Sequence, residues 1–212
     1  MVKAKGTSEL GELHAELERL PEHLLGEILG GELVVSPRPA PRHVHATSFL
    51  GSDILQRFGR GRDSGWWIYY EPELHLGPDA IVPDLAGWRR ERMPAPPVEA
   101  YFSVAPDWVC EILSPRTAAS DRVRKMPIYA REGVPFLWLV DPLLHTLEVY
   151  LLREAGWLLH SAHRGEETVT VPPFEESALE LSGWWLPTDE ATLEAAPGAA
   201  SGGTTEPGGQ AT

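Results

Sequence analysis

The sequence has a single cysteine, and this scarcity excludes two kinds of small domain. Cys110 is the one thiol among 212 residues, so no internal disulfide framework can form. No pattern of Cys and His residues has the spacing of a zinc site. A chain without disulfides suits a reducing compartment, and we therefore expect a cytoplasmic protein. Cys110 lies inside an apolar run and is predicted to be a packing residue.

Long hydrophobic runs are also missing. No apolar stretch reaches the roughly 18–20 residues that a bilayer-spanning helix needs. The first twenty residues contain no apolar segment of the kind found in signal peptides, so neither export nor a membrane partner is expected. The hydrophobic content of 42% and the eight tryptophans indicate a globular domain with a sizeable core.

Positive charge is scarce as well. The formal net charge is −13, which argues against a protein that coats nucleic acid. The acidic excess lies in the flanks: residues 1–37 carry 3 basic and 7 acidic side chains, residues 165–212 carry 0 and 9, and the middle carries 15 of each. A neutral centre permits local contact with phosphates and predicts weak non-specific binding to DNA.

Composition divides the chain into three parts. Residues 1–20 are predicted to form a charged N-terminal arm, either a short helix or a loose segment. Residues 21–190 are predicted to form one domain. Residues 191–212 are rich in Gly, Ala, Pro and Thr, which predicts a disordered tail.

Hydrophobic patterning within the domain predicts an α/β (α+β) fold, with a mixed β-sheet flanked by helices. The expected elements are a strand at 31–37, a helix at 41–58, strands at 66–76, 81–88 and 107–113, a helix at 117–133, a strand at 134–141, and an antiparallel meander over 145–171. The core order is therefore α-β-β-β-α-β, followed by additional antiparallel strands.

An acidic residue interrupts the most apolar of these strands. Glu111 lies in the middle of the run WVCEIL, where an ionised carboxylate is almost never left unpaired. Asp84 follows Pro83 on the preceding predicted strand. Two carboxylates from adjacent strands can converge on a hard divalent cation, and the backbone carbonyl of Ile112 can supply a third oxygen. The pattern predicts a metal site that meets the charge of Glu111.

Lysine is rare: the chain has three lysines and fifteen arginines. Lys3 and Lys5 lie in the predicted arm, so Lys125 is the one lysine of the predicted domain. This usage suggests that a compact ammonium is needed at that position, and chance is an alternative of similar weight. Pro127 would kink a helix here, unless the helix starts late enough to place the proline in its first turn. The direction of the Lys125 side chain is therefore left open.

The blocks GELVVSP, PRH, VPDL and PDWVCEILSPRT…DRVRK…YAREGVPFLWLVDP occur in an order that resembles the Uma-type restriction endonuclease family, within the PD-(D/E)XK nuclease superfamily. The resemblance covers roughly residues 24–186, and residues 81–142 carry most of it. It implies a restriction-endonuclease-like core and a metal-dependent site. Pro83-Asp84 matches the "PD", and Glu111-Ile112-Leu113 matches the "(D/E)XK", with leucine in place of the lysine. Lys125 fills the position to which the lysine has migrated in this family.

The resemblance also implies Mg²⁺ as cofactor, with Mn²⁺ able to substitute, and DNA as substrate. Glu73 is a further candidate ligand or outer-shell residue, and strand alternation would place it on one face with Glu71; a solvent-facing acidic pair is the alternative. His43, in the "PRH" block, is a candidate contact to phosphate, and local hydrogen bonding at a helix N-terminus is its alternative. The remaining candidate phosphate contacts, with exposed helix charges as the alternative, are Arg116, Arg122 and Arg124.

The leading interpretation is a Mg²⁺-dependent DNA endonuclease that hydrolyses phosphodiester bonds with a metal-activated water. Asp84 and Glu111 would hold the metal, and Lys125 would position the water or stabilise developing negative charge. One alternative is a nuclease-fold binding module with little or no catalysis, acting in a nucleic-acid or protein complex. Another is a metal-dependent hydrolase of RNA or a nucleotide. A homodimer would supply two sites for two strands, with residues 146–171 as the expected interface.

Overall fold

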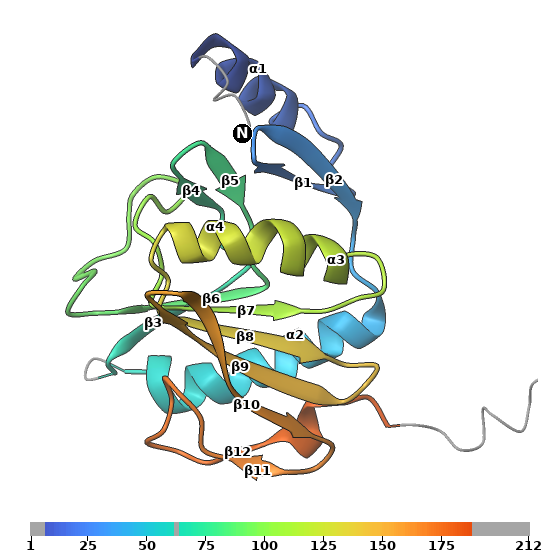
Figure 1. The fold of residues 1–212 in the computed structure, drawn as a ribbon, viewed down its shortest axis with the longest axis vertical. Helices are drawn as coiled ribbons and strands as arrows, with labels where there is room; N and C mark the ends of the chain where they lie inside the picture. Colours follow the sequence, from blue (N-terminus) through green and yellow to red (C-terminus); the bar gives the residue numbers. More distant parts are fainter. Residues whose placement is uncertain (1–6, 62–63, 188–212) are drawn as a thin grey trace, which may run out of the picture.

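The computed structural model describes residues 7–61 and 64–187, and its centre is a six-stranded mixed sheet (Figure 1). The strand order is β10-β9-β8-β7-β6-β3, in which β7 and β8 are parallel and the other neighbours are antiparallel. The strands are β3 (Trp66–Tyr70), β6 (Leu85–Arg89), β7 (Trp108–Ile112), β8 (Phe136–Asp141), β9 (Thr146–Arg153) and β10 (Gly156–Arg164).

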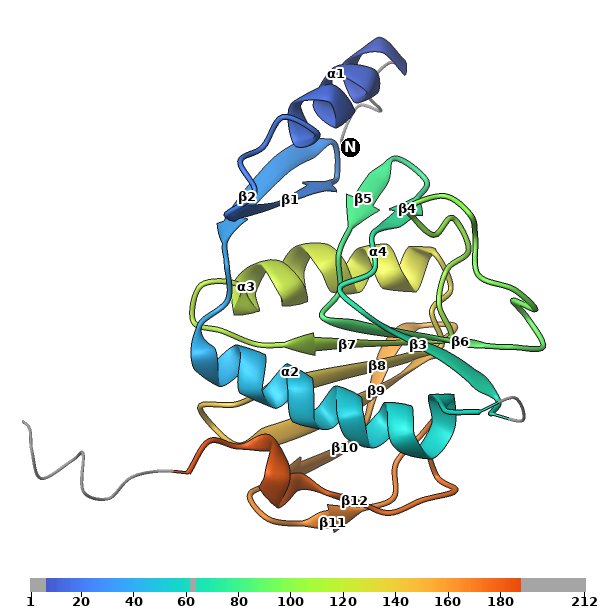
Figure 2. The same cartoon turned by 180° about the vertical axis from the view of Figure 1, so that it is seen from behind.

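Helices cover the two faces of this sheet (Figures 1 and 2). On one face lies α2 (Pro41–Ile54), which continues into a π-helical turn, η1 (Leu55–Gly59). On the other face α3 (Ala118–Ser120), a second π-helical turn η2 (Asp121–Lys125) and α4 (Met126–Arg131) follow one another without a break. The order α2, β3, β6, β7, α3–α4, β8 is the predicted α-β-β-β-α-β core, so the predicted fold class is confirmed.

A second, four-stranded antiparallel sheet lies on the far side of α4 (Figure 1). Its order is β2-β1-β5-β4, and its strands are β1 (Leu24–Leu29), β2 (Glu32–Pro37), β4 (Leu74–Leu76) and β5 (Asp79–Ile81). Gly30 and Gly31 both have positive φ, 63° and 80°, which a two-residue hairpin turn between β1 and β2 requires. Helix α1 (Thr7–Leu17) packs on this hairpin. Strand β1 was not predicted.

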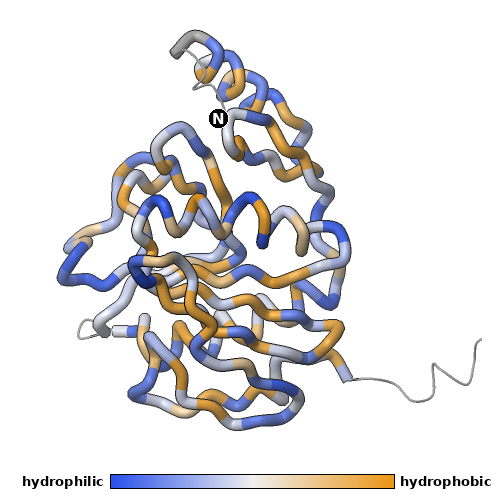
Figure 3. The backbone as a smooth tube through the Cα atoms, in the orientation of Figure 1, coloured by the Kyte–Doolittle hydropathy of each residue, from blue (hydrophilic) through white to orange (hydrophobic). Residues whose placement is uncertain are grey.

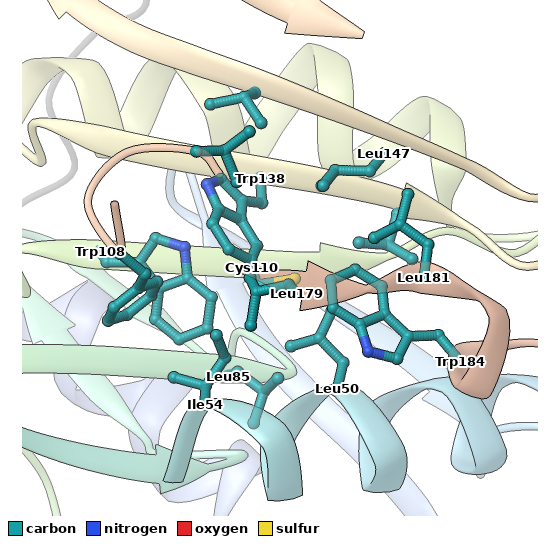
Figure 4. Packing of buried hydrophobic residues seen from close by; sticks show 14 of the residues in the cluster. Leu50, Ile54, Leu85, Trp108, Cys110, Trp138, Leu147, Leu179, Leu181 and Trp184 are labelled. Atoms are coloured by element: carbon teal, nitrogen blue, oxygen red, sulfur yellow. The ribbon is translucent and has the colours of Figure 1, made fainter. Parts of the chain in front are cut away.

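Alternation along β7 sends its side chains into two separate cores. Cys110 and Ile112 belong to the cluster beneath α2, together with Trp138 and Leu50 (Figure 4). Val109 belongs to the cluster around α4. Hydrophobic residues follow the central strands in Figure 3, as this double burial requires. Glu111, between two residues that face α2, is therefore turned toward α4, and Cys110 is the predicted packing residue.

Two predicted strands are each broken at a proline, and this was the main error of the sequence-based assignment. The predicted strand 66–76 is two strands, β3 and β4, which lie in different sheets, with Pro72 in the gap. The predicted strand 81–88 is divided in the same way between β5 and β6, with Pro83 in the gap. Proline has no N–H to donate to a sheet ladder, so each of these strands ends there. The chain passes between the two sheets at both breaks.

The C-terminal part departs from the predicted meander. Strands β9 and β10 form the expected antiparallel pair, but β11 (Thr168–Val169) pairs with β12 (Leu179–Glu180) in a separate small sheet. A short 3-10 helix, η3 (Leu181–Trp184), follows. The predicted tail, 191–212, lies outside the described residues, and the proposed boundaries at residues 20 and 190 stay predictions. Within residues 7–61 and 64–187, no helix combines the length and apolar character that a membrane crossing needs.

Candidate active site

Asp84 lies in the break between β5 and β6, one residue before β6 begins. The paired part of β6 starts at Leu85, opposite Cys110 of β7. The Asp84 carboxylate then takes the place of the next ladder bond, because its Oδ2 accepts a hydrogen bond from the backbone N–H of Ile112 at 2.6 Å. Its Oδ1 lies 3.1 Å from Nε2 of His43. Asp84 is thus fixed against the end of β7, and its oxygens keep further lone pairs for another ligand.

Glu111 is buried in this structure, with 2% of its surface exposed, and it is fully paired. The phenol O–H of Tyr129 donates to Oε1 at 2.5 Å. The ammonium of Lys125 lies 3.3 Å from each carboxylate oxygen. A hydroxyl donor and a cation therefore meet the carboxylate that interrupts the apolar strand, which is what a buried charge needs to be tolerated.

The direction of Lys125, which the sequence left open, follows from the π-helical turn before Pro127. Pro127 has no N–H to donate to the carbonyl four residues earlier. The chain widens its turn instead, and the N–H of Met126 donates to the carbonyl of Asp121, five residues back. Pro127 then falls in the first turn of α4, where proline is tolerated. Single π-helical turns of this kind are frequent at functional sites.

The side chain of Lys125 is 8% exposed, and its ammonium lies among oxygen atoms from several segments of the chain. Its Nζ donates to the carbonyl of Val82 at 3.0 Å and to Oε2 of Glu111 at 3.3 Å, and it forms an ion pair with Oε1 of Glu27 at 3.0 Å. Oδ1 of Asp121 lies at 3.7 Å, beyond normal hydrogen-bonding distance.

Three carboxylates therefore lie around one ammonium: Glu111 and Asp121 are buried, and Glu27 is partly exposed. Burial raises the pKa of Glu111 well above its usual range, and the charge of Lys125 offsets this only in part. Burial also raises the pKa of Asp121 to about 6, against the opposing effect of Lys125. Burial acts to lower the pKa of Lys125, but the neighbouring carboxylates, Glu111 first, hold it well above its usual value.

We expect Asp121→Asn to gain stability relative to the wild type as the pH rises from about 4 to 6. The folded-state pKa of Asp121, about 6, stands above the unfolded value near 4, so the folded protein binds the extra proton in this window and loses stability as the proton leaves. This difference between the folded and the unfolded pKa corresponds to about 3 kcal/mol of stability. Urea unfolding of both proteins at pH 4, 5, 6 and 7 measures the difference. Parallel stability curves would contradict the raised pKa.

The oxygen donors that a divalent cation needs lie at the same wall. In an extended strand the N–H and C=O of one residue point to the same edge. The carbonyl of Ile112 is therefore turned toward the Asp84 side, where its own N–H is bound. Asp84, Glu111 and this carbonyl offer oxygen atoms only, which suits a hard cation such as Mg²⁺ that keeps several waters. Among the described residues no group of three or more His, Cys, Asp or Glu side chains is placed so that it could hold a metal ion.

A cavity of about 620 Å³ opens over this wall, beside β2 and the start of α3. Asp84, Glu111 and Lys125 line it together, as the sequence predicted. His43 also lines it, beside Asp84. Burial acts to lower the pKa of His43, but the hydrogen bond and charge of Asp84 outweigh it, and the pKa is raised. Arg116 lies on the exposed rim, where a phosphate can reach it.

The structure does not bring Arg122 and Arg124 to the cavity. Arg122 pairs with Glu148 at 3.2 Å, and Arg124 pairs with Glu32 at 2.9 Å, both at the surface. Neither side chain lines the cavity. Their positions fit the alternative interpretation, in which both arginines are exposed charges on a helix.

Glu73 is also placed away from Asp84. It accepts a hydrogen bond from His75 at 2.6 Å and lines an adjacent pocket rather than the cavity. Residues 71–73 do not continue the strand, and Glu71 has a φ of 44°, so the expected sharing of one strand face by Glu71 and Glu73 is wrong. Glu71 lines the cavity instead.

Sequence reasoning missed three partners of the site, although each carried a signal. Asp121 and Tyr129 lie four residues before and four residues after Lys125, a spacing that brings helical neighbours together. Glu27 interrupts the apolar strand LLGEIL just as Glu111 interrupts WVCEIL. A lone acid in an apolar strand was therefore a usable signal in both places.

Comparison with known proteins agrees with the fold. The family model described as "Uma2: Putative restriction endonuclease" matches residues 14–183. A solved structure titled as a "putative nuclease belonging to DUF820" from Anabaena variabilis ATCC 29413 superposes with a TM-score of 0.67. It is 24% identical, and the alignment covers 81% of this chain and 97% of the other, so it supports the shared fold. No curated protein matches the sequence. Because the family match spans most of the chain, from α1 to the C-terminal 3-10 helix, this protein belongs to the Uma2 family of restriction-endonuclease-like proteins.

Proposed function

We propose that the protein is a divalent-metal-dependent DNA endonuclease whose active site is the cavity lined by Asp84, Glu111 and Lys125. The proposal depends on one observation: these three side chains line the same cavity. Asp84 comes from the residue before β6, Glu111 from β7 and Lys125 from the π-helical turn. Two carboxylates can hold a hard divalent cation, and an ammonium beside them can stabilise negative charge that develops on a phosphate.

Asp84, Glu111 and the carbonyl of Ile112 would hold the cation, with Mg²⁺ as the expected ion and Mn²⁺ as a substitute. When bound, the cation supplies Lewis-acid chemistry: it polarises a phosphate oxygen and lowers the pKa of water. The chain's own residues do the rest. His43 fixes one oxygen of Asp84, and Tyr129 fixes one oxygen of Glu111. Such outer partners set the direction of ligand oxygens.

Lys125 can stabilise the negative charge that builds up on phosphate oxygens during hydrolysis. Its ammonium lies at the cavity wall within hydrogen-bonding distance of Glu111. A donor fixed in advance in a water-poor site stabilises such charge far more than one in bulk water. Arg116 on the rim is suited to neutralise a neighbouring phosphate.

One observation favours a second candidate, a nuclease-fold module that binds nucleic acid without cutting it. Glu111 is 2% exposed, and both of its oxygens already have protein partners. A cation would therefore have to share this carboxylate with Lys125. The two functions differ in whether bound DNA is cut.

The deciding experiment offers the wild-type protein four substrates of one sequence: supercoiled plasmid, linear duplex, single-stranded DNA and RNA. Each is tested with Mg²⁺, with Mn²⁺ and with EDTA. The proposal expects DNA to be cut with either metal and left intact with EDTA. Binding without cutting would establish the binding module. Cutting of RNA alone would establish a ribonuclease, the third interpretation of the sequence.

We also propose that the protein forms a homodimer through the edge strand β10. Leu158 and Leu159 are 53% and 50% exposed there, and β10 has no partner strand on its outer side in the described sheet. An exposed apolar strand edge is a template for pairing with a second copy. Analytical ultracentrifugation is expected to give a dimer at micromolar concentration and a monomer for Leu158→Asp. A monomeric wild type would refute the proposal.

A further inference from the structure

One carboxylate of the site comes from outside the α-β-β-β-α-β core. Glu27 lies on β1, in the four-stranded sheet, and its side chain is 13% exposed. Its Oε1 forms an ion pair with Nζ of Lys125 at 3.0 Å and accepts a hydrogen bond from the backbone N–H of Val82 at 2.9 Å. Lys125 in turn donates to the carbonyl of Val82 at 3.0 Å. The ion pair and the two hydrogen bonds close a ring of three residues.

This ring connects the segment that leads to Asp84 with the ammonium of Lys125. Val82 lies in the break between β5 and β6, two residues before Asp84, and the ring binds both its N–H and its C=O. The same ring holds the ammonium of Lys125. Asp121 cannot do the same, because it lies 3.7 Å from the ammonium and is itself on the turn that carries Lys125.

The contacts of Lys125 differ in length. Its Nζ lies 3.0 Å from Oε1 of Glu27 and from the carbonyl of Val82, and 3.3 Å from each oxygen of Glu111. Glu27 and Val82 are therefore its nearest partners, and they can keep the ammonium in place when a phosphate oxygen takes the place of Glu111.

We propose that Glu27 is a positioning residue of the nuclease site: its carboxylate holds the ammonium of Lys125 against the cavity wall and fixes the segment that leads to Asp84. The proposal rests on the function proposed above and adds a residue to it. It also means that the N-terminal hairpin β1–β2 completes the active site rather than merely covering it. Glu27 touches neither substrate nor metal in this role.

The variant Glu27→Gln tests whether the negative charge of Glu27 positions Lys125, because it keeps the contact to the backbone of Val82. Glutamine keeps the shape and an acceptor oxygen for Val82 but loses the negative charge that faces Lys125. The matched control is Glu32→Gln, because Glu32 lies on the same hairpin and pairs with Arg124 of the same helical turn, outside the cavity. Circular dichroism and urea unfolding check that both variants stay folded.

The first readout needs no activity. The chain has three lysines, so protein labelled with ¹⁵N and ¹³C at lysine gives three side-chain signals, and the one that Lys125→Arg removes belongs to Lys125. At pH 7 without metal, we expect the Lys125 signal to move or broaden in Glu27→Gln and to stay in place in Glu32→Gln. An unmoved signal in Glu27→Gln would overturn the proposal, whatever the enzyme does.

The second readout is plasmid cleavage with Mg²⁺. Loss of an outer partner typically costs about 10–100-fold, and here we expect this loss in kcat with little change in KM. A displaced Lys125 signal with an unchanged kcat would also overturn the proposal. A wild type that cuts no DNA would refute the proposed function, and the lysine signal would still show whether Glu27 holds Lys125.

Discussion

Asp84→Asn and Glu111→Gln should each abolish Mn²⁺ binding and lower DNA cleavage by a factor on the order of 1,000 or more. Both changes remove a carboxylate charge from the wall of the cavity while keeping the size of the side chain. Loss of one stabilising group in an active site costs about 100–1,000-fold, and loss of a metal ligand removes the group that it holds as well. Calorimetric titration with Mn²⁺, followed by plasmid cleavage, measures both effects.

The fold should survive in Asp84→Asn, because the amide oxygen can still accept the N–H of Ile112. The matched control for the second variant is Glu148→Gln. Glu148 lies on β9 of the same sheet and also accepts from a tyrosine, Tyr150, at 2.7 Å, and pairs with a cation, Arg122. It does not line the cavity, so this control should bind Mn²⁺ and cut DNA like the wild type. Two folded variants that bind Mn²⁺ normally would exclude the proposed metal site.

The sequence predicted which side chains would lie close together more fully than it predicted the elements around them. The proximity of Asp84 and Glu111 required only two adjacent strands, and the structure places Asp84 just before β6 and Glu111 near the end of its neighbour β7. A buried acid needs a partner wherever it lies, so the strand sequence around Glu111 was enough to predict that a partner exists. The partners of Glu111 are Lys125 and Tyr129, and both come from the helical segment η2–α4 that covers this face of the sheet.

The predictions that were wrong or missing depended on the phase of a helix, on the alternation along a strand, or on contacts between distant segments. The π-helical turn shifts the helical phase, so a regular helix gives no correct direction for Arg122 and Arg124. The break at Pro72 likewise ended the alternation on which the placement of Glu73 rested. Glu27 reaches Lys125 from another sheet, and no local pattern states which distant carboxylate will meet a given ammonium.

Lys125→Met should destabilise the protein by about 3–5 kcal/mol at pH 8, besides removing cleavage activity. Breaking a buried pair by deleting one partner leaves the other charge buried and uncompensated, which is the origin of this magnitude. Here the buried carboxylates of Glu111 and Asp121, and the partly exposed one of Glu27, would lose their shared cation. Guanidinium unfolding gives the free energy of unfolding. The control is Arg124→Met, which breaks a surface pair with Glu32 and should cost at most about 1 kcal/mol.

The pH dependence and a second substitution identify the cause of this loss. Without Lys125 the buried carboxyls bind protons in the folded state at a higher pH than in the unfolded chain, so the variant loses stability as the pH rises and regains it as the pH falls toward 5. Adding Glu111→Gln to Lys125→Met should likewise recover part of the loss, since it removes the most deeply buried uncompensated charge. A loss that is the same at pH 5 and pH 8, and unrelieved in the double variant, would mean that Lys125 acts through packing of its alkyl chain. If both the lower pH and the added Glu111→Gln relieve the loss, the ammonium of Lys125 compensates the negative charge of the cluster. The same negative charge would attract a divalent cation.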